Sequence, residues 1–205
     1  GGTDPRSLLG AEFMIAAAAL DQLPPPGPPE VAFAGRSNAG KSSAINALAG
    51  RNRLAFASRT PGRTQQIVMF GLPSGAIVAD LPGYGYAAVP KAVKRVWQDV
   101  LATYVATRST LVALVLVVDA RHGLKPLDLS MLDGFLPSGR PVMVLATKSD
   151  KLTRTESARA SAAIRGQLAE RYREQAAYVT VVPFSATART GLMEADAILA
   201  GWLAA

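Results

Sequence analysis

The chain contains no cysteine and only one histidine, His122, among its 205 residues. The lack of cysteine excludes a disulfide framework, a thiolate metal site and a cysteine nucleophile, which suits a cytoplasmic protein. No stretch reaches the roughly 18 apolar residues of a membrane span. The apolar stretch 13–20 is short, and the acidic Glu12 before it and the Pro-rich run 24–29 after it do not fit a signal peptide. We therefore expect no stable membrane association.

Hydrophobic residues make up 49% of the chain, and its length suits one well-cored domain. The formal net charge of +7 favours polyanionic partners: nucleic acid, ribosomal RNA or an anionic membrane. An ordinary solvated basic surface is the alternative. We expect residues 1–29 to form an N-terminal arm and Pro-rich linker, with no structural role for residues 1–6, and residues 30–205 to form the domain.

Residues 35–42 match G-x-x-x-x-G-K-[ST], the phosphate-binding P-loop. Backbone N–H groups of such a loop point at the β-phosphate, while Lys41 reaches the β- and γ-phosphates and the Ser42 hydroxyl is placed for Mg²⁺. A short apolar strand, 31–34, precedes the loop, and a helix, 43–48, follows it. The predicted phosphate-binding residues are Gly35, Arg36, Ser37, Asn38, Ala39, Gly40, Lys41, Ser42 and Ser43.

Strand and helix patterns alternate after the P-loop, which predicts an α/β fold with helices on both faces of a mostly parallel sheet of about six strands. This is the three-layer architecture of P-loop NTPases with a Ras-like G domain. Ligands of such sheets bind at the carboxyl ends of the strands. Further strands are expected at 66–70, 76–80, 111–119, 141–146 and 178–182, and further helices at 91–107, 126–136, 155–174 and 191–203.

A D-x-x-G sequence, Asp80 to Gly83, follows the strand 76–80. A carboxylate at this point can hold Mg²⁺ through water, and the Gly83 N–H can contact the γ-phosphate and respond to its loss. The motif alone is weak, because most such sequences are turns. Its place after a buried strand favours the functional interpretation.

A guanine-reading pattern, [NT]-K-x-D, is present at residues 147–150, directly after the strand 141–146. The Asp150 carboxylate can accept hydrogen bonds from guanine N1–H and the N2 amine, donors that adenine lacks. The Lys148 stem can lie along the base, and Thr147 stands where Asn is commoner. In the sequence Phe184-Ser185-Ala186 the small residues let the Ala186 N–H approach guanine O6.

The polar segment 51–65 contains two threonines, Thr60 and Thr64, either of which can bring its hydroxyl to Mg²⁺ when the γ-phosphate is present. Spacing alone does not choose between them. The segment would then act as an order–disorder switch, with a basic surface loop as the alternative.

Together these motifs resemble the EngB (YihA/YsxC) GTPases of the TrmE–Era–EngA–EngB–Septin-like class. The strings that carry the resemblance are GRSNAGKSS at 35–43, PGRTQ at 61–65, DLPGYGYA at 80–87, TKSD at 147–150 and FSA at 184–186. The resemblance covers the chain from about residue 30 and selects Thr64 as the switch threonine, with Gly62 beside it. It implies a role in assembly of the large (50S) ribosomal subunit, in cell division and in septation. Ala39 stands where Val is more usual.

Two positions bear on the mechanism. Tyr84 stands where Ras-like enzymes have a water-orienting Gln, and a phenol cannot do that job in the same way, so we expect slow intrinsic hydrolysis. Asn38 matches the asparagine that ligates potassium in related GTPases, and a K⁺ there would supply part of an arginine finger's charge. An Asn that merely shapes the loop is the alternative, and equal hydrolysis rates in Na⁺ and K⁺ would favour it.

The sequence therefore predicts a monomeric, cytoplasmic, slow GTPase that converts GTP to GDP and phosphate. Its expected catalytic residues are Lys41, Thr64 and Gly83, its Mg²⁺ ligands Ser42, Thr64 and Asp80, and its base-binding residues Thr147, Lys148, Asp150, Ser185 and Ala186. Two alternatives stay open: a nucleotide-gated binding module with negligible hydrolysis, and an ATP-using P-loop enzyme. Basic clusters at Arg51, Arg53, Arg59 and Arg63, and at Lys151, Arg154, Arg159, Arg165, Arg171 and Arg173, are candidates for phosphate contacts on ribosomal RNA.

Overall fold

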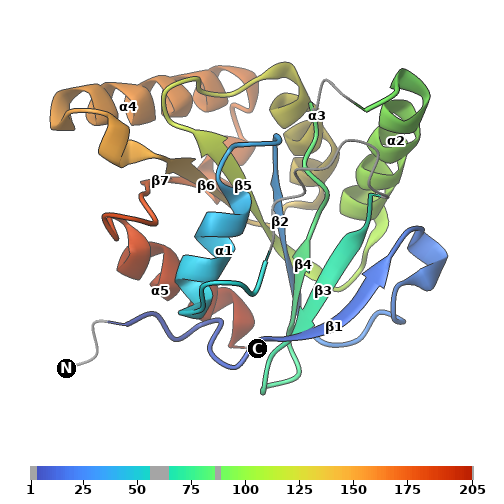
Figure 1. Ribbon diagram of the computed structural model, residues 1–205. Helices are drawn as coiled ribbons and strands as arrows, with labels where there is room; N and C mark the ends of the chain where they lie inside the picture. The colour runs from blue at the N-terminus through green and yellow to red at the C-terminus, as the bar shows by residue number, and fades with distance from the viewer. Residues whose placement is uncertain (1–3, 56–64, 86–88, 205) are drawn as a thin grey trace.

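Seven strands form one sheet in the order β1-β3-β4-β2-β5-β6-β7 (Figure 1). The computed structural model describes residues 4–55, 65–85 and 89–204. Strand β3 pairs antiparallel with β1 and β4, and the remaining neighbours pair parallel. The predicted mostly parallel α/β sheet is confirmed, with seven strands instead of about six. The strands are β1 (Glu12–Ala17), β2 (Glu30–Gly35), β3 (Ile67–Gly71), β4 (Ile77–Asp80), β5 (Leu111–Asp119), β6 (Val142–Thr147) and β7 (Val179–Pro183).

Helices cover both faces of this sheet (Figure 1). Buried residues of α2, α3 and α4 pack in one apolar cluster, and those of α1 and α5 pack in the other. The helices are α1 (Lys41–Ala49), α2 (Lys91–Thr107), α3 (Pro126–Phe135), α4 (Arg154–Arg171) and α5 (Leu192–Leu203). Short 3₁₀ turns are η1 (Leu20–Gln22), η2 (Leu136–Ser138), η3 (Ser149–Lys151) and η4 (Gln175–Tyr178).

The central strand β2 serves both layers of the core, because its side chains alternate between the two faces of the sheet. Val31 and Phe33 enter the cluster with α1 and α5, while Ala32 and Ala34 enter the opposite one, and all four are fully buried. A strand buried on both faces reads as a continuous apolar run, which is why the sequence predicts it readily.

Helix α2 has the predicted bounds, but its apolar stripe is only partly buried. Leu101 and Tyr104 lie in the core, whereas Val93 and Val96 are 40% and 58% exposed. Helix α4 begins with a reciprocal capping box between Thr153 and Glu156 and ends at Arg171, three residues before the predicted end.

The N-terminal arm contributes a strand that the sequence analysis does not assign. β1 pairs with β3 at the edge of the sheet, with a bulge between Phe13 and Ile15 that shifts its register. Phe13 is 65% exposed and Met14 is 45% exposed, so the alternation of apolar and polar residues that marks a half-buried strand is missing. The division of the chain at residue 30 into arm and GTP-binding module stays a prediction.

A buried ionic cluster joins the start of β2 to the end of α2. The fully buried Glu30 carboxylate accepts hydrogen bonds from the Tyr104 hydroxyl and from the Arg108 guanidinium, at 3.0 Å for Nη2. Arg108 also donates to the Pro24 carbonyl at 2.9 Å. A buried carboxylate needs such partners, since an unpaired one is costly.

The arm is fixed at its other end by the Asp196 carboxylate of α5. Its Oδ1 atom accepts hydrogen bonds from the backbone N–H groups of Arg6 (3.0 Å) and Ser7 (2.8 Å) and from the Ser7 hydroxyl (2.5 Å). Asp196 is buried, and the neighbouring Leu8 is fully buried against the cluster beneath α1 and α5. Charge-assisted bonds of this kind tie the two ends of the chain together.

We predict that Asp196→Ala lowers the free energy of unfolding by about 2 kcal/mol, because hydrogen bonds to a charged group contribute about 1.5–3 kcal/mol. Urea denaturation followed by circular dichroism measures the change. Glu194→Ala, on the same helix but exposed, is the matched control and should stay within about 0.5 kcal/mol of the parent. Equal stabilities for the two variants would contradict the role of Asp196.

Candidate functional site

The P-loop lies between β2 and α1, at the carboxyl edge of the sheet. Gly40 caps α1 with φ of 93°, a left-handed conformation that favours glycine. Asn38 also has a positive φ, 69°. At Gly35 a Cβ atom would lie 2.7 Å from the Val117 carbonyl oxygen, so only glycine lets β2 approach β5 this closely. Both motif glycines therefore answer a specific geometric need.

Lys41, the P-loop lysine, forms an ion pair with the buried Asp80 at the end of β4. This contact places the D-x-x-G carboxylate beside the P-loop. Ser42 follows Lys41 in the first turn of α1. A hydroxyl and a carboxylate are hard oxygen donors of the kind that Mg²⁺ prefers, and Mg²⁺ is usually bound by one or two protein ligands with phosphates and water. The residues around Lys41 thus fit a magnesium–nucleotide complex.

The described residues contain no cluster of three or more His, Cys, Asp or Glu side chains arranged for a metal.

The base motif contacts the P-loop directly. The buried Thr147 hydroxyl donates to the Ala39 carbonyl (2.5 Å), with the Val118 carbonyl at 3.1 Å. Lys148, at φ 59°, extends its Nζ to the Asn38 carbonyl at 2.7 Å. The contact at position 147 needs a hydrogen-bond donor, which a Thr hydroxyl and an Asn amide both supply, and this explains how Thr can replace the commoner Asn.

The predicted guanine-reading residues meet at the ends of β6 and β7. The fully buried Ser185 donates its hydroxyl to Asp150 Oδ1 at 2.9 Å, and Ser149 N–H donates to the Phe184 carbonyl at 3.1 Å. Asp150 itself is exposed, so it is accessible to a base. Ala186 follows directly. The structure thus brings residues 147–150 and 184–186 together as the sequence predicts.

Gly83 and Tyr84 are fastened to the P-loop through the backbone. Ser37 N–H donates to the Tyr84 carbonyl at 2.8 Å, and Tyr84 N–H donates to the Gly35 carbonyl at 3.3 Å. A Cβ atom on Gly83 would lie 3.1 Å from Ser37 Oγ and 3.2 Å from its nitrogen. The D-x-x-G glycine is therefore packed against the phosphate loop.

The Tyr84 side chain turns toward α3. Its hydroxyl donates to Asp128 Oδ1, while Asp128 Oδ2 accepts from the Lys125 N–H at 2.9 Å. Burial raises the pKa of the Tyr84 phenol well above its ordinary value, and the Asp128 charge adds to the effect. Burial likewise raises the pKa of Asp128, partly offset by its hydrogen bonds. The phenol therefore stays protonated and hydrogen-bonded to α3.

A cavity of about 260 Å³ opens beside the P-loop, between Asn38, the end of β5 and Lys148. At its rim Asp119 Oδ2 pairs with Arg121 (2.8 Å) and lies 3.6 Å from Lys148 Nζ. Burial alone would raise the pKa of Asp119, but the Arg121 hydrogen bonds and charge, with Lys148, outweigh it and lower the pKa to about 2. Asp119 is thus a carboxylate that holds the base-motif lysine.

Some predicted residues lie apart from this geometry. Gly62 and Thr64, and with them Thr60, Arg59 and Arg63, fall outside the described residues. Ser43 is exposed on α1.

Sequence reasoning missed Asp119, Arg121 and Asp128 as contributors to the site. The position of Asp119 at the end of an apolar strand was the only signal in the chain for that residue.

Comparison with known proteins identifies the family. Residues 30–148 match the family model described as "50S ribosome-binding GTPase". The "Probable GTP-binding protein EngB" of Azoarcus sp. (strain BH72) is 53% identical over 193 residues, covering 94% of this chain and 91% of that protein. The Bordetella pertussis protein of the same description is 48% identical over 200 residues, with 94% of each covered. The chain belongs to the EngB family. It is a GTPase that binds guanine nucleotides.

Solved structures show the same fold. A crystal structure of a probable GTP-binding protein EngB aligns with TM-score 0.66 and 23% identity, covering 85% of this chain and 98% of that one. Aquifex aeolicus Era bound to GDP and AlF₄⁻ aligns with TM-score 0.61 and 24% identity, covering 85% of this chain and 56% of Era. None of the described helices has both the length and the apolarity to cross a membrane.

We predict that Arg121→Ala raises the pKa of Asp119 from about 2 toward its ordinary value of 3.8, because its main lowering partner is lost. Carboxyl-detected NMR titration measures this pKa. In the parent protein the Asp119 pairing stabilises the fold above the ordinary pKa and is lost as the pH falls toward 2. The exposed Arg173→Ala is the control, and a pKa of Asp119 that stayed near 2 in Arg121→Ala would refute the assignment.

Proposed function

We propose that this EngB protein is a GTP-gated switch that acts in assembly of the large ribosomal subunit. Its GTP form binds the pre-ribosomal particle, and hydrolysis releases it. The observation that carries the proposal is the convergence of P-loop, D-x-x-G and base motif at one sheet edge in a chain that matches a 50S ribosome-binding GTPase family. We further propose that the protein acts in the cytoplasm as a monomer and is needed for normal cell division and septation.

The P-loop and two switch segments bind the phosphates and Mg²⁺ in this proposal. Lys41 leaves Asp80 to contact the β- and γ-phosphates, and the P-loop N–H groups cradle the β-phosphate. Ser42 and Thr64 hold Mg²⁺, with Asp80 assisting through water. When bound, Mg²⁺ neutralises charge that develops on the phosphates. Potassium at Asn38 stays a prediction.

Guanine is read by residues already held in place. Asp150, oriented by Ser185, accepts from N1–H and the N2 amine. Lys148, held between Asp119 and the Asn38 carbonyl, lies along the base. Ala186 N–H reaches O6.

Intrinsic hydrolysis is slow in this proposal, because the Tyr84 hydroxyl is bound to Asp128 and is not free to orient the attacking water. The ribosomal particle would then complete the site or position the water. A nucleotide-gated module with negligible hydrolysis of its own is the limiting case, and multiple-turnover phosphate release distinguishes the two.

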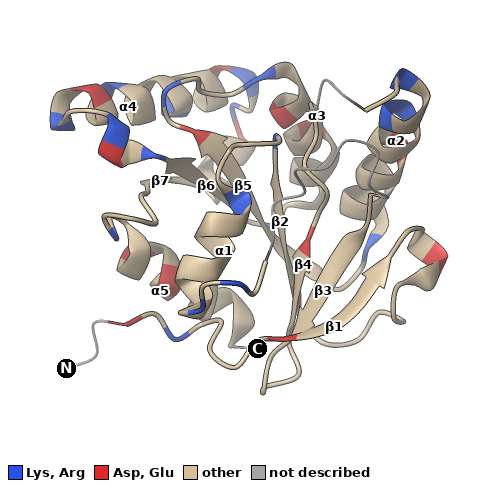
Figure 2. Cartoon of the chain, in the orientation of Figure 1, with Lys and Arg blue, Asp and Glu red and all other residues tan. Residues whose placement is uncertain are grey.

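Some basic side chains on and near α4 are paired within the protein, and the others support a contact with ribosomal RNA. Lys and Arg residues are spread along α4, interleaved with acidic ones (Figure 2). Arg171 is paired with Asp133, and Arg51 donates to the Ala11 carbonyl. Among the described residues of α4 and its flanks, the exposed basic residues without such an ion pair or hydrogen bond are Lys151, Arg154, Arg159 and Arg173.

We predict that Asp150→Asn weakens GDP and GTP binding roughly 10²- to 10⁴-fold, because two hydrogen bonds to a charged acceptor are lost at about 1.5–3 kcal/mol each. Titration of a fluorescent GDP measures the affinity. Asp133→Asn, which removes a carboxylate from an exposed ion pair with Arg171, is the matched control and should bind normally. Unchanged affinity in Asp150→Asn would contradict the guanine-reading role of this carboxylate.

We predict that the protein co-sediments with purified large ribosomal subunits, in K⁺ buffer, with a non-hydrolysable GTP analogue and not with GDP. The small subunit and the Asp150→Asn variant are the controls. Absence of binding in both nucleotide states would remove the ribosome from the proposal and leave the GTPase assignment in place.

A further inference from the structure

Three segments far apart in the sequence meet at Tyr84. They are the P-loop, the start of the segment that follows β4, and the N-terminus of α3. Tyr84 is paired with Arg36 as a short parallel bridge, and its backbone exchanges hydrogen bonds with Gly35 and Ser37. Its hydroxyl reaches the opposite way, to Asp128. One residue thus joins the phosphate loop to a helix that has no predicted nucleotide contact.

The α3 end of this connection is rigid. Asp128 is only 1% exposed, and it accepts the Lys125 N–H in the first turn of α3 as well as the Tyr84 hydroxyl. A buried carboxylate with both oxygens engaged has few alternative positions, since leaving either partner costs desolvation. The phenol is therefore held at a fixed point.

The P-loop end is closely packed. A Cβ atom on Gly83 would lie 3.1 Å from Ser37 Oγ, and one on Gly85 would lie 3.1 Å from the Arg36 guanidinium. The residues on both sides of Tyr84 are thus in contact with P-loop side chains. A shift of Tyr84 would move Gly83, which carries the N–H aimed at the γ-phosphate.

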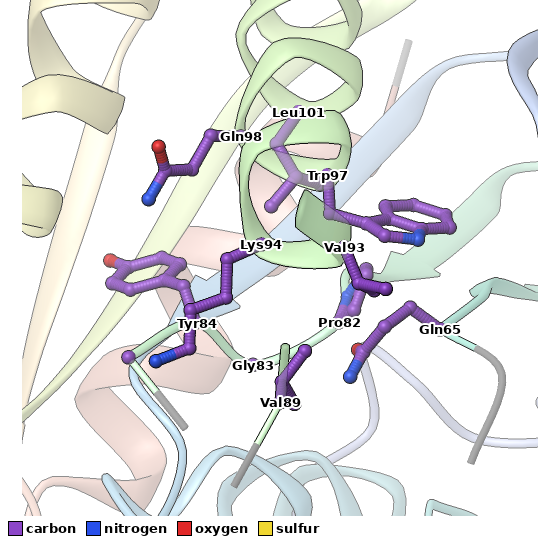
Figure 3. Close-up of a pocket in the computed structure, with 11 residues that line it drawn as sticks. Gln65, Pro82, Gly83, Tyr84, Val89, Val93, Lys94, Trp97, Gln98 and Leu101 are labelled. Atoms are coloured by element: carbon purple, nitrogen blue, oxygen red, sulfur yellow. The ribbon is translucent and has the colours of Figure 1, made fainter. Parts of the chain in front are cut away.

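The position of the Tyr84 ring indicates that its side chain does not act on the nucleotide directly. Tyr84 lies at one side of a small cavity, lined also by Pro82, Trp97 and Leu101. In the view of Figure 3 its ring lies on the opposite side of the pocket from Gln65 and Trp97. Since the hydroxyl is bound to α3, the side chain acts on the site only through its own backbone.

We propose that Tyr84 is a positioning residue: its hydrogen bond to Asp128 holds Gly83 against the P-loop and so adds to the affinity for nucleotides that carry a γ-phosphate, relative to GDP. This inference rests on the proposed function, because it assumes a switch that responds to GTP. It concerns nucleotide affinity in the isolated protein, so it can fail or succeed independently of ribosome binding.

The test is the ratio of two affinities in Tyr84→Phe, which keeps the ring and removes only the hydroxyl. In the proposed switch Gly83 N–H contacts only the γ-phosphate, which GDP lacks, so the affinity for GDP should stay within about twofold of the parent. Affinity for a non-hydrolysable GTP analogue should fall roughly tenfold to a hundredfold, the size expected from loss of one charge-assisted hydrogen bond. Isothermal titration with each nucleotide gives both values.

The matched control is Tyr104→Phe, which removes a tyrosine hydroxyl from another buried carboxylate, Glu30, in the core cluster beside α2. Both variants lose a buried hydrogen bond, but only Tyr84→Phe should change the affinity ratio. Asp128→Asn removes the acceptor's charge from the other side and should shift the ratio in the same direction as Tyr84→Phe.

Three results would overturn the inference: an unchanged ratio in Tyr84→Phe and Asp128→Asn, an equal loss of both affinities, or an equal shift of the ratio in Tyr104→Phe. If the ratio shifts as expected and the parent does not bind ribosomal subunits, the positioning role stands while the ribosomal proposal fails. The converse pattern rejects the positioning role alone.

Discussion

The site depends on the buried hydroxyl of Thr147. This group bonds the Ala39 carbonyl and lies beside the Val118 carbonyl, so one side chain joins β6, the P-loop and β5. The P-loop backbone is thus held by a residue of a neighbouring strand. The lysine that follows adds a second bond, to Asn38. The phosphate-binding loop and the guanine-binding motif are thus joined directly by hydrogen bonds.

Asp119 and Asp80 balance the positive charge of two lysines in the site. Each carboxylate lies at the end of a strand next to a lysine of the site. Asp80 pairs with Lys41, and Asp119 lies near Lys148. Buried cations without partners are costly. The carboxylates keep both lysines in place at the strand ends, and a bound nucleotide with Mg²⁺ can replace at least the first of these pairs.

Much of this could be predicted from the sequence, because the strands buried on both faces are continuous apolar runs and each motif follows a strand directly. β5 and α2 have the predicted bounds, and residues 147–150 meet 184–186 as expected. The strand β1 could not be predicted, since its exposed Phe13 and its bulge remove the alternating pattern. The Tyr84–Asp128 hydrogen bond could not be predicted either, because it joins residues 44 positions apart and neither residue alone indicates a partner.

The Asp196 contact has a consequence for folding on the ribosome. Its partner Ser7 is made 189 residues earlier, so the N-terminal segment cannot form this contact until α5 has been synthesised. The sheet strands between them can pair before that moment. Leu8 and Ala11, both buried in the finished fold, would meanwhile face water in the nascent chain. This contact therefore closes only after α5 has been made, and a chain stalled before α5 would display an unburied apolar segment near Ser7.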